Sequence, residues 1–254
     1  MAIVNTTPDS FYSGSRTTDD DNGFQRVKEM LTLGADIIDV GGYSSRPGAT
    51  TVSEEEEIQR VLPIIRRISA EYPEVMISID TFRGSVAEAA IRAGAHIIND
   101  ISGFETDPKI ATVAAKYNVP YILMHMRGTP ENMQDNTDYS NLFVEMMQFF
   151  TKKIAILQAM GVHDIVLDPG FGFGKNIEQN HFLLHHLEAF HCLNKPLLVG
   201  VSRKSMIYKK LNITPETALN GTIALNTIAL LKGASILRVH DVKETREVID
   251  LLKG

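Results

Sequence analysis

Short apolar runs rich in β-branched residues alternate eight times with longer amphipathic stretches along this chain. The apolar runs predict strands, which cover residues 2–4, 37–40, 75–79, 97–99, 121–124, 165–167, 197–199 and 236–239. The amphipathic stretches predict helices, for example over residues 53–71, 83–93, 140–160 and 216–232. A doubly wound open sheet shares this alternation, so the count of eight decides for an α/β fold of the (β/α)8 TIM-barrel type. Because that fold often has about 250 residues, we expect residues 1–254 to form a single domain.

Charge and composition exclude several classes of partner. The formal net charge is −6, which disfavours broad electrostatic binding to nucleic acid or to an anionic membrane surface. Apolar runs fall well short of the roughly 20 residues that span a bilayer. Cys192 is the only cysteine, so an internal disulfide is impossible and a reducing compartment is expected. We therefore predict a cytoplasmic protein that binds neither nucleic acid nor membranes.

Polar side chains stand at or just beyond the end of every predicted strand. They are Asn5, Asp39, Asp80, Asn99, His125, Asp168, Ser202 and His240. The carboxyl ends of parallel barrel strands converge on one rim, where the active site of such a barrel is built. Since side chains alternate along a strand, Arg238 and His240 should point the same way. A single polar residue at a strand end is more often a loop hydrogen bonder, but a complete set favours a functional rim.

The chemistry of this predicted rim narrows the ligand. Three carboxylates and two carboxamides can read a heterocycle that carries several N–H donors, because ionised carboxylates only accept hydrogen bonds. Local positive charge comes from Arg46, Arg203, Lys204, Arg238 and His240. Such cations suit an anionic substrate or leaving group. The pattern therefore predicts a donor-rich ring attached to a phosphate-like group.

Motifs at these strand ends resemble those of dihydropteroate synthases. NTTPDSFYSGS at residues 5–15 and GGYSSRPGA at residues 41–49 resemble the two signature loops of that family. The remaining motifs follow in the family's order: ISID, IIND, MHMRGTP, DPGFGFGK, GVSRKSM and LRVHD. The resemblance covers the whole chain. It implies a pterin-binding transferase of folate biosynthesis, a sulfonamide target that condenses 6-hydroxymethyl-7,8-dihydropterin diphosphate with para-aminobenzoate to form 7,8-dihydropteroate and diphosphate.

The resemblance also implies roles for individual residues. Substrate binding would fall to Asp39, Asp80, Asn99, Met124, Asp168, Phe173, Lys204, Ser205, Arg238, Ser45 and Pro47. Catalytic roles would fall to Arg46, Lys204, Arg238 and His240. Asn5 would reach a Mg²⁺ ion beside the diphosphate, since Mg²⁺ keeps most of its waters and favours phosphate oxygens. Family members also pair, so a homodimer is expected.

The chain departs from the family pattern in its signature loops. Ser13 stands where an aspartate is usual, Tyr43 where a glutamate is common, and Ser45 replaces a threonine. Family members generally carry a short segment before the first strand, whereas this chain starts within that strand, so we expect that segment to be lacking. Two alternatives stay open: another pterin-binding barrel such as a methyltetrahydrofolate methyltransferase, and a catalytically silent pterin-binding protein.

Two other patterns are interpreted as structural. The glycine-rich run before Lys175 lacks the first glycine and the final hydroxyl residue of a phosphate-binding loop. Four histidines at positions 181, 185, 186 and 191 predict a solvated helix rather than a metal site. Neither pattern predicts a functional role.

Overall fold

The computed structural model describes residues 1–6, 16–43 and 52–253, without the side chains of residues 16–21. The strands in these ranges are β1 (Ala2–Asn5), β2 (Ile37–Gly41), β3 (Met76–Asp80), β4 (Ile97–Asp100), β5 (Tyr121–Met124), β6 (Ile165–Asp168), β7 (Leu198–Val199) and β8 (Ile236–Leu237). The α-helices are α1 (Arg16–Thr32), α2 (Glu54–Glu71), α3 (Gly84–Arg92), α4 (Lys109–Tyr117), α5 (Leu142–Ala159), α6 (Ile177–His185), α7 (Ser205–Tyr208), α8 (Leu219–Leu231) and α9 (Val242–Leu252). Short 3₁₀ helices are η2 (Met133–Asp135), η3 (Leu187–Leu193) and η4 (Pro215–Thr217).

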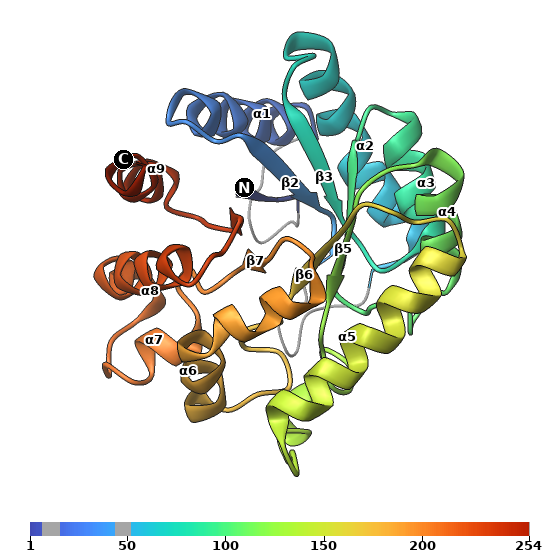
Figure 1. The fold of residues 1–254 in the computed structure, drawn as a ribbon. Coiled ribbons are helices and arrows are strands. Elements are labelled where there is room, and N and C mark those ends of the chain that lie inside the picture. The colour runs from blue at the N-terminus through green and yellow to red at the C-terminus, as the bar shows by residue number, and fades with distance from the viewer. Residues whose placement is uncertain (7–15, 44–51, 254) are drawn as a thin grey trace.

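The strands form a ring that the helices surround (Figure 1). Strands β1 to β6 pair in sequence order as one parallel sheet, and β7 pairs with β8 in a second. Parallel bridges join the two sheets, one between Leu167 and Leu197 and the other between Ala2 and Val239. The molecule is therefore a TIM barrel, as the eight alternations predict. We call the places where these bridges join the sheets the β6–β7 seam and the β8–β1 seam.

The barrel interior holds an apolar layer that positions the rim. Met1, Ile97, Ile122 and Leu198 form a buried cluster, against which Ile37, Val166 and Ile236 pack. Residues two apart along a strand share a face, so the next interior layer starts two positions later. For Ile37, Ile97 and Val166 those positions hold Asp39, Asn99 and Asp168. The same strands that fill the core thus carry polar side chains to its carboxyl end.

The predicted helices occur close to their expected bounds, with one exception. The predicted helix over residues 216–232 is interrupted at Ala218, between η4 and α8. The guanidinium of Arg203 donates to the carbonyls of Pro215 and Glu216 at 3.0 and 2.9 Å. These carbonyls serve a tertiary contact, and the amides of Thr217 and Ala218 instead close short turns to the residues three before them. Tertiary contacts therefore override the local helical pattern.

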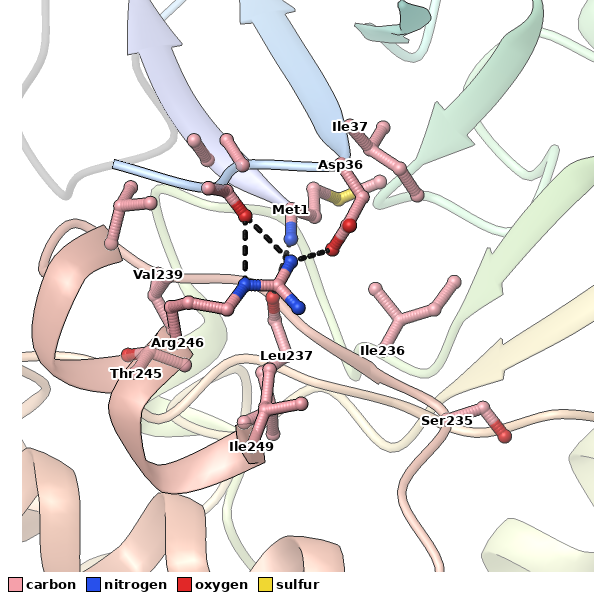
Figure 2. A pocket seen from close by; sticks show the side chains of 14 residues that line it. Met1, Asp36, Ile37, Ser235, Ile236, Leu237, Val239, Thr245, Arg246 and Ile249 are labelled. Atoms are coloured by element: carbon pink, nitrogen blue, oxygen red, sulfur yellow. Dashed lines mark hydrogen bonds and ion pairs between the residues drawn. The ribbon is translucent and has the colours of Figure 1, made fainter. Parts of the chain in front are cut away.

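The amino ends of the strands lie at the end of the barrel opposite their carboxyl ends, and Figure 2 shows the pocket near Met1 and Asp36 at this end. There Arg246 of α9 donates to the carbonyl of Gly34 and to the carboxylate of Asp36. A cavity of about 200 Å³ lies beside them, lined largely by apolar side chains such as Ile37, Leu237 and Ile249. In the described part of the chain, every helix is too short or too polar to cross a membrane.

Candidate active site

Side chains from four strands meet at the carboxyl end of the barrel. Arg238, just after β8, donates from Nε to Oδ2 of Asp39 at 2.6 Å and from a terminal nitrogen to Oδ2 of Asp80 at 2.5 Å. Asn99 of β4 donates its Nδ2 to the same oxygen of Asp39 at 3.1 Å. The sequence placed each of these residues on the rim separately, and the structure joins them in one network.

The burial of this network determines its electrostatics. Burial raises the pKa of Asp80, opposed by the attraction of Arg238 and assisted by the nearby charge of Asp39. Burial alone would lower the pKa of Arg238, but the two carboxylates outweigh that effect and raise it. The second oxygen of Asp39 is buried without a hydrogen-bond partner among the described residues. Buried acceptors of this kind are rare unless a water or ligand serves them.

A second group of site residues lies across the barrel, between β6 and the start of α7. Burial raises the pKa of Asp168, and the attraction of Lys204 opposes the shift. Burial lowers the pKa of Lys204 to about 8. The ammonium of Lys204 donates to the carbonyl of Phe171 at 2.6 Å and lies 4.8 Å from the ring centroid of Phe173. Ser205 follows as the first residue of α7. A carboxylate, an amine and an aromatic face therefore stand together beside the arginine network.

Comparison with known proteins shows the family of this chain. The pterin binding enzyme family model matches residues 1–240. Dihydropteroate synthase from Escherichia coli K12 is 45% identical, over 100% of this chain and 90% of the relative. The Yersinia pestis dihydropteroate synthase, in complex with a sulfonamide drug, superposes with a TM-score of 0.93 at 44% identity, over 99% of this chain and 91% of that one. The Xanthomonas albilineans dihydropteroate synthase with 4-aminobenzoic acid gives 0.92 at 38% identity, over 99% and 90%.

The chain belongs to the dihydropteroate synthase family. It is accordingly a transferase, and both the fold and the family predicted from its motifs are confirmed.

Lys175 is a buried residue near the site to which the sequence assigned no role. Its ammonium donates to the carbonyls of His125, Gly170 and Phe173 at 3.2, 3.0 and 2.9 Å. Burial lowers its pKa to about 7. A Cβ on Gly170 would lie 2.0 Å from the carbonyl oxygen of His125, so this loop packs directly on the backbone after β5. The alternating glycines before Lys175 were the available signal, because close backbone contact excludes side chains.

His240 contacts Ser202, the polar residue that follows β7. Its Nδ1 lies 3.1 Å from Oγ of Ser202, and its backbone amide donates to that same oxygen at 3.2 Å. Burial, with the repulsion of Arg238, lowers the pKa of His240 to about 4. The imidazole is therefore neutral near pH 7 before any anion binds.

Two residues expected at the rim have other surroundings. Arg203 was expected among the rim cations, but it pairs with Asp241 at 2.6 Å and donates to backbone carbonyls outside the ring. His125 was expected as a rim side chain, but its ring lies buried against Phe149, at a centroid distance of 4.9 Å. Burial lowers the pKa of His125 well below its usual value. Both predictions were wrong, because strand position alone does not show which way a loop side chain turns.

The remaining predicted residues lie at strand ends or outside the described residues. Met124 ends β5 fully buried, and Asn5 ends β1 partly exposed. Ser13, Ser45, Arg46 and Pro47 lie outside the described residues. Of the departures from the family pattern, Tyr43 alone can be placed. It donates its hydroxyl to Glu131 at 3.4 Å and packs edge-on against Phe82.

Proposed function

We propose that this chain condenses 6-hydroxymethyl-7,8-dihydropterin diphosphate with para-aminobenzoate in folate biosynthesis. A bond forms between the aniline nitrogen and the pterin methylene carbon, the carbon–oxygen bond to diphosphate breaks, and the amine loses a proton. Family membership and the Xanthomonas relative with 4-aminobenzoic acid support this reaction. The observation that supports it most directly is the set of buried acceptors at the rim, Asp39, Asn99 and Asp168, beside the half-buried cations Lys204 and Arg238.

The pterin would be read by the buried carboxylates and carboxamide. Asp168, Asp80 and Asn99 face one interior, so they can pair with the N–H donors of the aminopyrimidinone edge. The unpartnered oxygen of Asp39 adds one more acceptor in the same network. Lys204 would contact acceptor atoms of the ring, and Arg238 would pack over its face. Met124 would form part of the wall. Burying these charges is costly without partners, which a donor-rich ring supplies.

The diphosphate would bind beside the pterin. Arg238 and His240 offer N–H donors there, and we assign Arg46 to the same group. A Mg²⁺ ion fits at Asn5, because Asn5 and Asp80 flank Gly41 on adjacent strands and both present hard oxygen atoms toward it. When bound, Mg²⁺ would stabilise negative charge on the departing oxygens. Electrostatic stabilisation of the leaving group would then supply much of the rate enhancement.

Para-aminobenzoate would bind against Phe173, with Lys204 and Ser205 beside it. We assign Ser45 and Pro47 to the same subsite. The aniline nitrogen attacks as a neutral amine, so no strong base is required. Catalysis of this step rests on orienting the second substrate above the pterin methylene.

Three wider features of the protein belong to the proposal. One contiguous hydrophobic cluster runs through the described residues and supports a single domain over residues 1–254. Exposed Phe182, Leu211 and Leu231 on and beside α6, α7 and α8, which lie together in Figure 1, support pairing with a second copy. An exposed free thiol at Cys192 fits a reducing cytoplasm.

A coupled assay tests the reaction. With Mg²⁺ and the pterin diphosphate present, diphosphate release should depend on added para-aminobenzoate. We expect activity despite Ser13 and Tyr43, because the buried pterin and anion groups are present. Tight pterin binding without such release would support the silent binder. Methyl transfer from methyltetrahydrofolate would support the methyltransferase.

A further inference from the structure

We propose that Ser202 is a positioning residue that sets the tautomer of His240, so that the neutral ring carries its proton on Nε2. This inference rests on the proposed function only in assigning the diphosphate as the group that Nε2–H contacts. The tautomer itself depends on the contacts between two residues, one after β7 and one after β8.

The hydroxyl of Ser202 occupies a fixed position between two groups of the same histidine. Ser202 is buried, and its Oγ lies 3.2 Å from the backbone nitrogen of His240. A backbone amide can only donate, so this oxygen accepts there. The same oxygen lies 3.1 Å from Nδ1 of the ring. The Oγ of Ser202 therefore contacts both the main chain and the imidazole of His240.

The direction of the second hydrogen bond follows from the serine's own proton. A hydroxyl has one proton to donate, and the amide of His240 cannot accept it. Among the described residues, Nδ1 is the acceptor within hydrogen-bonding distance of Oγ. If Nδ1 carried the proton instead, the buried hydroxyl of Ser202 would be left without an acceptor, which buried polar groups rarely tolerate. Ser202 therefore donates to Nδ1, and the ring proton resides on Nε2.

This arrangement gives His240 a defined chemical role. The Nε2–H can donate to a phosphate oxygen without the ring first gaining a proton. The other tautomer would turn a lone pair toward the diphosphate and repel it. Burial beside Arg238 also disfavours the protonated ring, in agreement with a neutral donor. Which nitrogen carries a histidine's proton is commonly set by the hydrogen bond at the other one.

Nitrogen-15 spectra of the ligand-free protein test the tautomer directly. The chain has eight histidines, and a His240→Asn spectrum assigns the ring of interest. We expect the Nε2–H form in the wild type and a mixture of both forms in Ser202→Ala. Ser202→Thr keeps the hydroxyl and should restore the wild-type pattern. A wild-type ring protonated on Nδ1, or an unchanged ring in Ser202→Ala, would overturn the proposal.

Kinetics separate this inference from the proposed function. Ser202→Ala should lower kcat about tenfold and weaken inhibition by diphosphate, with the KM for para-aminobenzoate unchanged. Ser78→Ala is the matched control, because it removes a buried hydroxyl that has no partner among the described residues. If the tautomer changes in Ser202→Ala but diphosphate inhibition does not, the control of the ring by Ser202 stands and the placement of diphosphate at His240 fails.

Discussion

The two ends of the barrel each hold an arginine beside acidic side chains, but the two settings differ. At the carboxyl end Arg238 pairs with Asp39, whose side chain is fully buried, and with Asp80. At the amino end Arg246 pairs with Asp36, whose side chain is 72% exposed. Ile37, the residue after Asp36, packs against the apolar interior cluster. The two arginines are about equally buried, so the contrast lies in the carboxylates: one is fully buried at the carboxyl end and one is largely exposed at the amino end, as expected where one end binds ligand.

The largest effect should come from removing the arginine at the buried end. Arg238→Met leaves two carboxylates without their partner, so we expect the free energy of unfolding to fall by about 3–5 kcal/mol. The kcat/KM for the pterin diphosphate should fall at least about a hundredfold. Arg246→Met is the matched variant and should cost less, about 1–2 kcal/mol, because it loses an exposed ion pair and its hydrogen bonds to the carbonyl of Gly34; activity should be retained. Denaturant titration and steady-state kinetics measure both. Equal losses in the two variants would contradict the contrast between the ends.

A loss of pterin affinity with a smaller loss of stability is expected from a change at Asp168, the carboxylate near Lys204. Asp168→Asn keeps the shape of the side chain but replaces one acceptor oxygen with a donor, so the affinity for the pterin should fall about a hundredfold or more. Calorimetry on the folded variant measures this affinity. Asp36→Asn at the opposite end should leave it unchanged. Unaltered pterin binding in Asp168→Asn would remove this carboxylate from the site.

Lys175 should make the unfolding free energy of the protein depend on pH. In the unfolded chain a lysine keeps its proton to about pH 10.4, whereas burial lowers the pKa of Lys175 to about 7 in the folded protein. Between these values the unfolded state binds more protons, so this residue makes stability rise with pH. The unfolding free energy of the wild type minus that of Lys175→Met should increase by ~2 kcal/mol from pH 7 to pH 9.

Denaturation at several pH values checks this dependence. Lys152→Met, which removes an exposed lysine on α5, should change stability little throughout the range. If the difference in unfolding free energy between the wild type and Lys175→Met does not vary with pH, the lowered pKa of Lys175 is contradicted.

The smallest effect concerns the departure at position 43. Tyr43→Glu would place a second carboxylate beside Glu131, in place of the present hydrogen bond. We expect a cost below about 1 kcal/mol, seen as a change of a few fold in the KM values. Adding Glu131→Lys should restore them, because the new pair attracts. If the double variant is no better than Tyr43→Glu alone, the contact with Glu131 does not matter for catalysis.

The sequence predicted the strands, their order and the rim because these depend on local pattern. Because side chains alternate along a strand, Asp39 is predicted to share a face with Ile37, whatever its partners are. The pairing of Arg238 with Asp39 and Asp80 could not be predicted in this way, since 199 and 158 residues separate the partners. Motif resemblance supplied a role for Arg238, but not its contacts.

Loop residues were the least predictable. The backbone of Arg203 has a positive φ of 55°, and its guanidinium turns to Asp241. Lys175 lies in a run whose glycines indicate close backbone contact but not which carbonyls its amine would reach. Asp241 contacts Arg203 from 38 positions away, and the carbonyl of His125 reaches Lys175 from 50 positions away, so local sequence carries no direct signal for these contacts.

The charged pairs of the candidate site also lie across the two seams of the barrel. Arg238 reaches from β8 to Asp39 and Asp80 across the β8–β1 seam, and Lys204 is attracted to Asp168 across the β6–β7 seam. Bridges between single residue pairs join the sheets there, whereas β1 to β6 pair continuously. Electrostatic attraction thus holds the ring together where backbone pairing is sparsest. Local opening of β7 and β8 would dismantle the site and the ring in one cooperative event, and a bound ligand should slow amide hydrogen exchange there more than in β2 to β4.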